Sequence, residues 1–128
     1  MTVPIVLVVD DDDSVREITQ LALEVVAGWQ VIPASGGAEA LELARSRRPD
    51  AVLLDVMMPE MDGPTTFRHL QADEVTRDIP VILLTAKVLA GERQLWDELP
   101  IHGVIPKPFD PMGLHSEVSR MLGWYQER

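Results

Sequence analysis

Side chains that could do chemistry follow directly on several short apolar segments of this sequence. In chain order they are Asp10 and Asp11, Asp55, Thr85 and Lys107. A solvated strand end would explain any one of them alone, but it does not explain why four such segments all stop at a charged or hydroxyl group. The set therefore predicts one site to which all four segments contribute.

Three carboxylates at such a site would repel one another, by about 4 kcal/mol per pair at 4 Å and an effective dielectric near 20. A cation must neutralise them. Oxygen ligands without a nearby His or Cys suit Mg²⁺, which shares its shell with water and phosphate oxygens. Lys107 adds a second positive charge, and the Thr85 hydroxyl can donate a hydrogen bond to an anionic oxygen. Together these groups predict a site for an acyl phosphate on an aspartate.

The segments that carry these side chains have the composition of β-strands. Residues 5–9, 51–54 and 81–84 are nearly continuous runs of Val, Ile, Leu and Ala, as in central strands of a parallel sheet that are covered on both faces. Residues 30–34 and 103–105 are more mixed, as edge strands are. In open parallel sheets ligands bind beyond the carboxyl ends of the strands, which is where the chemical side chains fall.

Segments with a helical period separate the strands. Ile18, Leu21, Ala22 and Val25 are spaced to form one apolar stripe on a helix that begins near Asp12, Asp13 or Ser14. Further helices are predicted at about 38–46, from 63–64 onward, within 91–99, and from 114 to about 125. This alternation predicts a doubly wound α/β fold, with a five-stranded parallel sheet and helices on both faces.

Composition limits the function further. The 128 residues predict a single domain, 1–128, with a core at about 3–123 and no room for an output domain. The 21 acidic residues against 11 basic ones give a net charge of −10, which disfavours direct binding to nucleic acid or to anionic membranes. Cysteine is absent, and no signal peptide or membrane span is evident, so a cytoplasmic location is expected.

The motifs around the chemical residues resemble those of the receiver domain of two-component response regulators. They are Val8-Val9-Asp10-Asp11-Asp12, the run from Leu54-Asp55-Val56 to Met61-Asp62-Gly63, Leu84-Thr85-Ala86 and Lys107-Pro108-Phe109. The resemblance extends from Val3 to about Gly123, with each motif at the end of a predicted strand. It implies a flavodoxin-like sheet, similar to that of the chemotaxis regulator, with strand order 2-1-3-4-5.

The resemblance also implies roles for the site residues. Asp55 would be the phosphoacceptor, and Asp10, Asp11 and the backbone carbonyl of Met57 would join it as ligands of Mg²⁺. Thr85 and Lys107 would contact the phosphoryl oxygens. The Lys107–Pro108 peptide bond is expected to be cis, and Ala86 is expected to leave room for the phosphoryl group.

Partners follow from the same resemblance. The phosphoryl donor would be a sensor histidine kinase or a phosphotransfer protein, and an unidentified downstream protein would bind the face made by the fourth helix, fifth strand and fifth helix. Val104 stands where many family members carry Tyr or Phe, so an aromatic switch is impossible there. We expect phosphorylation to change residues 87–91 instead, with little repacking at Val104.

Two other functions fit parts of this pattern. A magnesium-dependent phosphohydrolase would need a second acid to protonate its leaving group, and Met57 stands where that acid would be. A receiver-like interaction domain that accepts no phosphate would typically have lost a site residue, and all are present. The prediction is therefore a signalling switch rather than an enzyme, which assists only its own phosphorylation and dephosphorylation.

Overall fold

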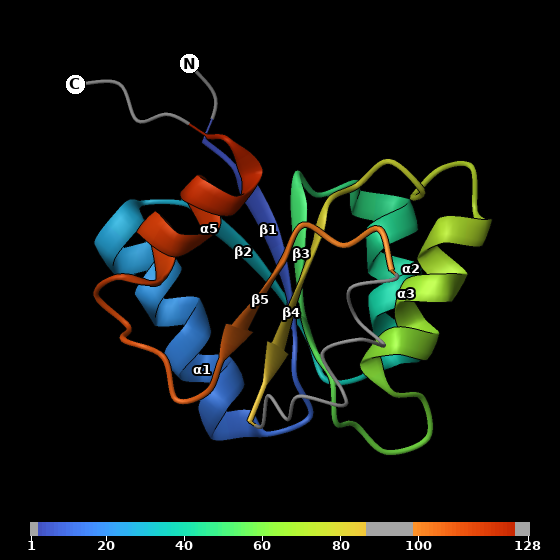
Figure 1. Cartoon of the computed structure of the whole chain (residues 1–128), viewed down its shortest axis with the longest axis horizontal. Helices are drawn as coiled ribbons and strands as arrows, with labels where there is room; N and C mark the ends of the chain where they lie inside the picture. Colours follow the sequence, from blue (N-terminus) through green and yellow to red (C-terminus); the bar gives the residue numbers. More distant parts are fainter. Residues whose placement is uncertain (1–2, 87–98, 125–128) are drawn as a thin grey trace.

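Apolar strands of this kind need cover on both faces, and the computed structural model provides it: a parallel sheet lies between two layers of helices (Figure 1). The structure describes residues 3–86 and 99–124. The strands are β1 (Ile5–Val9), β2 (Gln30–Ala34), β3 (Ala51–Asp55), β4 (Val81–Thr85) and β5 (Gly103–Pro106). Their order is β2-β1-β3-β4-β5 and every pair is parallel, which confirms the expected order and both edge strands.

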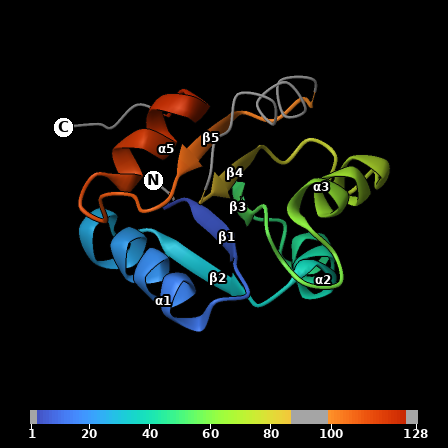
Figure 2. The same ribbon diagram turned by 60° about the horizontal axis from the view of Figure 1, so that its bottom comes forward.

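Successive residues of the central strands point into two separate cores. Helices α2 (Gly37–Arg47) and α3 (Gly63–Ala72) cover one face of the sheet, where Leu54 and Phe67 belong to the same buried cluster. Helices α1 (Asp13–Leu21) and α5 (Leu114–Leu122) cover the other face, where Leu53 shares a cluster with Val118. Figure 2 shows the two helix pairs on opposite sides of the sheet.

The start of α1 is set by Asp12, one of the three candidates from the sequence. Its backbone is extended, and its Oδ1 accepts hydrogen bonds from the backbone N–H groups of Ser14 at 2.9 Å and Val15 at 3.2 Å. These bonds satisfy two of the N–H groups that a helix leaves free in its first turn. The helix therefore begins immediately beyond the acidic residues at the end of β1.

The apolar stripe predicted for this helix does not face the core, and this part of the prediction was wrong. Of its four members only Ala22 is buried, whereas Ile18 and Leu21 are each 49% exposed and Val25 is 75% exposed. Helix α1 continues into a π-helical turn, η1 (Ala22–Val26). Ile18 and Leu21 precede this turn, so it does not account for their exposure; their spacing of three and four residues fits more than one face of a helix. Thr19 and Leu23 are buried instead.

The remaining helices agree with the sequence in type and differ at their ends. Helix α2 is one residue longer at each end than predicted. Helix α3 begins at Gly63 as expected, capped by Asp62, whose Oδ1 accepts from the Thr65 N–H at 2.8 Å. Helix α5 ends at Leu122 and is capped by Gly123, whose φ is 70°. The helix predicted within 91–99 falls almost entirely outside the described residues. Among the described helices, none combines the length and the apolar character needed to cross a membrane.

Candidate functional site

Strand register brings the predicted site residues to one edge of the sheet. Val9 of β1 pairs with Leu54 of β3, so Asp10 and Asp55 extend side by side from neighbouring strands. Asp55 in turn pairs with Leu84, directly before Thr85. Lys107 follows β5, and its backbone N–H donates to the carbonyl of Thr85 at 2.7 Å. The structure therefore places the carboxyl ends of four strands together, as the sequence predicted.

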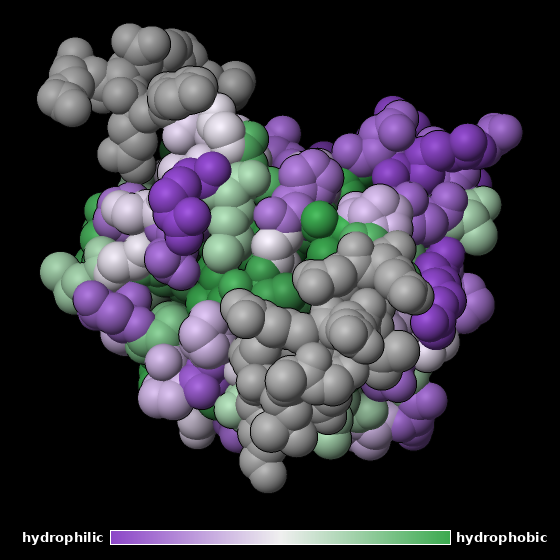
Figure 3. Space-filling model, viewed as in Figure 1, coloured by the Kyte–Doolittle hydropathy of each residue, from purple (hydrophilic) through white to green (hydrophobic). Residues whose placement is uncertain are grey.

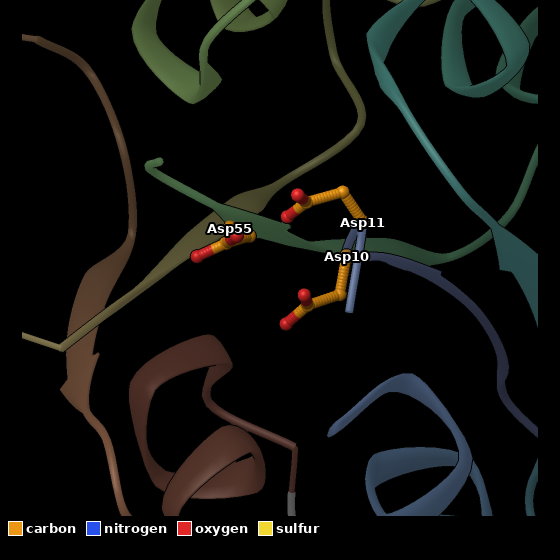
Figure 4. Close-up of side chains that lie close together, drawn as sticks. All are labelled: Asp10, Asp11 and Asp55. Atoms are coloured by element: carbon orange, nitrogen blue, oxygen red, sulfur yellow. The ribbon is translucent and has the colours of Figure 1, made fainter. Parts of the chain in front are cut away.

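Asp10, Asp11 and Asp55 form a compact carboxylate cluster. One oxygen from each lies within 4.8 Å of the others, and Figure 4 shows Asp10 and Asp11 extending toward Asp55. Asp10 is 1% exposed and Asp55 5% exposed, whereas Asp11 is open to solvent. Oxygen donors alone, with one side open for water, are the ligands that Mg²⁺ prefers. The residues present therefore fit this cation.

Lys107 reaches the cluster from the carboxyl end of β5, an edge strand of the sheet. Its Nζ donates to Asp10 Oδ2 at 2.7 Å and to Asp55 Oδ1 at 3.0 Å, and its side chain is only 16% exposed. These contacts are charge-assisted hydrogen bonds in a partly buried setting, where they are stronger than at the surface. The Lys107–Pro108 peptide bond is cis, which confirms that prediction.

The pKa values of Asp55 and Lys107 are set by burial together with neighbouring charges and hydrogen bonds. Burial raises the pKa of Asp55 above its ordinary value, the hydrogen bond from Lys107 opposes this, and the charges of Asp10 and Asp11 raise it further. For Lys107, burial disfavours the charged form, but its bonds to Asp10 and Asp55 outweigh burial and raise the pKa of the ammonium. Lys107 therefore stays a cation at neutral pH.

The other predicted site residues lie where the sequence put them. Thr85 is 3% exposed at the end of β4, and the exposed side chain of Met57 stands in the loop two residues after Asp55. Ala86 is exposed next to Thr85. Val104 of β5 is partly buried and packs against the core on the α2 and α3 face. Residues 87–91, where a phosphorylation-dependent change was predicted, lie outside the described residues.

Gly63 is a site residue whose role the sequence did not reveal. A Cβ built on it would lie 2.4 Å from the backbone oxygen of Asp55 and 2.9 Å from the Cα of Val56. The N–H of Gly63 also donates to the Val56 carbonyl at 2.9 Å. The sequence marks Gly63 as the end of the Asp55 motif and as a turn residue before a helix, but not its close approach to another backbone, which depends on the path of the loop.

Known proteins share both this sequence pattern and this geometry. The family model for the response regulator receiver domain matches residues 6–119. This chain belongs to that family. The receiver domain is 37% identical over 117 residues to the alkaline phosphatase synthesis transcriptional regulatory protein PhoP of Bacillus subtilis, over 91% of this chain and 48% of that protein. It is also 37% identical to the phosphate regulon transcriptional regulatory protein PhoB of Pseudomonas aeruginosa, over 91% of this chain and 51% of that protein. The chain thus spans about half the length of these relatives.

Solved structures resemble this receiver domain over nearly its whole length. The chemotaxis protein CheY4 of Vibrio cholerae aligns with a TM-score of 0.87 and 30% identity, over 94% of this chain and 99% of that chain. The receiver domain of the sensor histidine kinase PA1611 of Pseudomonas aeruginosa aligns with a TM-score of 0.84 and 29% identity, over 95% and 99%. That structure has a magnesium ion coordinated in its active site cleft. The chain is therefore a two-component signalling domain with a CheY-like, flavodoxin-type fold.

Proposed function

We propose that this receiver domain accepts a phosphoryl group on Asp55, with Mg²⁺ bound by Asp10, Asp11, Asp55 and the backbone carbonyl of Met57. The observation that carries the proposal is the carboxylate cluster within 4.8 Å, bridged by the Lys107 ammonium. Asp55 is the member that a phosphoryl group would join, because it lies at the end of the central strand β3 and its Oδ1 accepts from the Lys107 ammonium. The domain changes partner binding and turns over no other substrate.

The residues around Asp55 have separate tasks in this step. An oxygen of Asp55 attacks the phosphorus of a phosphohistidine, the P–N bond breaks as the O–P bond forms, and the imidazole departs with the bonding pair. Bound Mg²⁺ supplies positive charge to the phosphoryl oxygens. Lys107 turns from the Asp55 carboxylate to a phosphoryl oxygen, and the Thr85 hydroxyl donates to another. All of these groups come from rigid strand ends, so little rearrangement is needed.

The signal would leave the site through β5 and α5. A groove of about 470 Å³ lies beside Lys107, between the loop after β5 and the first turns of α5. Ile105, Phe109 and Leu114 give it apolar walls, and Arg120, paired with Glu117 at 3.2 Å, stands in its lining. Figure 3 shows apolar side chains gathered between α5 and the sheet on this face. Because Pro106 and Pro108 flank Lys107 and line the groove, a movement of Lys107 changes the surface that a downstream protein meets.

The phosphodonor would dock on α1. Ile18, Leu21, Val25 and Val26 form an exposed aliphatic surface on α1 and η1, which we call the α1 patch. Ile18 lies six residues after Asp12, or about 9 Å along the helix from the acidic end of β1. A histidine that reaches Asp55 must come from a protein seated over this end of the sheet. Contiguous apolar surface of this kind typically marks a protein contact, so we assign it to the helices of a histidine kinase or phosphotransfer protein.

Intact-mass spectrometry tests the proposed function. Incubation with acetyl phosphate and Mg²⁺ should add one phosphoryl group, and the adduct should be lost on treatment with hydroxylamine, which cleaves acyl phosphates. With EDTA in place of Mg²⁺ the adduct should be absent. An adduct that forms equally well in EDTA, or that resists hydroxylamine, would contradict the proposal.

Mg²⁺ affinity should fall as the pH is lowered. The pKa of Asp55 is raised above 3.8, chiefly by burial, so this carboxyl holds its proton to higher pH than an exposed aspartate does. The proton must leave before the oxygen can bind a cation, so the loss of affinity should begin above pH 3.8. Calorimetric titration at stepped pH values measures this. Constant affinity down to pH 4, or equal affinity in Asp11→Asn and wild type, would count against the assigned ligands.

The docking of the phosphodonor on the α1 patch can be tested separately. In Leu21→Glu, phosphotransfer from the histidine kinase that best phosphorylates the wild-type domain should slow by at least about tenfold, because a charge is placed within an apolar contact. Phosphorylation by acetyl phosphate should not change, since the site itself is intact. Val3→Glu is the matched control, because Val3 is 45% exposed but precedes β1 and belongs to neither α1 nor η1. If phosphotransfer slowed equally in both variants, the α1 patch would not be the docking surface.

A further inference from the structure

Arg16 ties together the two ends of the aspartate run that follows β1. Its side chain is 19% exposed and lies against the first turn of α1. Nη1 donates to the backbone carbonyl of Asp10 at 2.8 Å, and Nη2 donates to Oδ1 of Asp13 at 2.5 Å. One planar guanidinium thus holds the first and the last of the four aspartates at a fixed separation.

The position of Asp10 depends on its protein partners, because both of its carboxylate oxygens and its backbone carbonyl accept hydrogen bonds from other residues. Its Oδ1 accepts from the Asp12 N–H at 2.9 Å and its Oδ2 from Lys107 at 2.7 Å, while its carbonyl accepts from Arg16. At 1% exposure, water cannot readily replace a donor that is lost. The orientation of Asp10, and of Asp11 next to it, is therefore set by Lys107 on one side and Arg16 on the other.

The two cations differ in what they contact. Lys107 bonds carboxylate oxygens of Asp10 and Asp55, which are the groups that Mg²⁺ and a phosphoryl group would engage. Arg16 bonds a backbone carbonyl and the exposed Asp13, and neither belongs to the proposed metal site. Arg16 can therefore keep its contacts while Lys107 exchanges its own.

We propose that Arg16 is a positioning residue for the metal site: it fixes the backbone of Asp10 and Asp11, so that both carboxylates stay in place when Lys107 leaves Asp10. The inference rests on the proposed Mg²⁺ site. A simple charge effect would have the opposite sign, since removing a nearby cation would strengthen the attraction of the cluster for Mg²⁺. The direction of the change in affinity therefore separates the two roles.

Calorimetric titration with Mg²⁺ alone tests this inference on the wild type, Arg16→Ala and Arg16→Lys. Arg16→Ala should bind Mg²⁺ about 10- to 100-fold more weakly, as when other outer partners of metal ligands are removed. Arg16→Lys keeps the charge but loses the forked pair of donors, and it should be weakened by less. Arg77→Ala is the matched control, because Arg77 forms an exposed ion pair with Glu74 away from the site. In the metal-free protein, exchange of the Asp12 amide hydrogen should be faster in Arg16→Ala than in wild type.

The outcomes are separable from the proposed function. A wild-type domain that does not bind Mg²⁺ would remove the metal site itself. A folded Arg16→Ala with equal or tighter binding than wild type would overturn only the role of Arg16. If Arg16→Ala does not fold, Arg16→Lys decides: weaker binding with faster Asp12 exchange supports the inference, and wild-type affinity overturns it.

Discussion

Asp55→Asn should form no phosphoryl adduct with acetyl phosphate and Mg²⁺ under conditions that label the wild-type domain fully. An uncharged amide is not a nucleophile for phosphoryl transfer, and it also removes one of the three carboxylates that would hold the cation. Intact-mass spectrometry gives the result directly, with circular dichroism as the check that the variant is folded.

Asp78→Asn is the matched control for this variant. Asp78 is exposed and precedes β4, at the amino ends of the strands, whereas Asp55 lies at their carboxyl ends. Its substitution should leave labelling unchanged. Full labelling of Asp55→Asn would show that another residue accepts the phosphoryl group, and peptide mapping would then locate it.

Gly63→Ala should damage both the fold and the site although it adds a single methyl group. The new Cβ would lie 2.4 Å from the backbone oxygen of Asp55, so the end of β3 or the start of α3 must shift. Overpacking of this kind costs about 1–3 kcal/mol of unfolding free energy. A displacement of Asp55 by about 1 Å would slow phosphorylation roughly 100-fold. Urea unfolding and the rate of labelling by acetyl phosphate measure the two effects.

Two other glycines serve as controls for Gly63→Ala. A Cβ on Gly36 meets nothing within 4 Å, so Gly36→Ala should fold and label like wild type. A Cβ on Gly103 would meet the Met121 side chain at 2.4 Å, but that side chain is flexible and can move aside. If acetyl phosphate labelled Gly63→Ala as fast as Gly36→Ala, the close approach of Gly63 to the backbone of Asp55 would not be needed for phosphorylation.

The site could be read from the sequence because it depends on strand ends. Once residues 5–9 and 51–54 are recognised as neighbouring buried strands, the aspartates that follow them must lie at one edge. The order of the strands came from the resemblance to a family, since apolar runs alone do not say which strand lies beside which. Lys107 was placed by the same reasoning, and its contacts with Asp10 and Asp55 agree with it.

The parts that could not be predicted depend on geometry that leaves no periodic mark. The predicted buried stripe became the α1 patch because Thr19, Ala22 and Leu23 lie on the buried side of the helix, and the apolar spacing alone did not identify that side. Arg16 is three residues after Asp13 on a helix, so its pairing with Asp13 had a signal in the sequence. Its bond to the Asp10 carbonyl had none, because every residue carries a carbonyl.

The late position of Lys107 in the sequence means that the acceptor site is completed only near the end of synthesis. It lies 52 residues after Asp55 and 97 after Asp10, so at a ribosome the acidic residues emerge well before their counter-cation. At about 5–20 residues per second, Asp55 precedes Lys107 by roughly 3–10 s. Until β5 joins the sheet, Asp10 and Asp55 lack the ammonium that bridges them. Under the proposed function, a chain that still lacks Lys107 would be an incomplete phosphoryl acceptor.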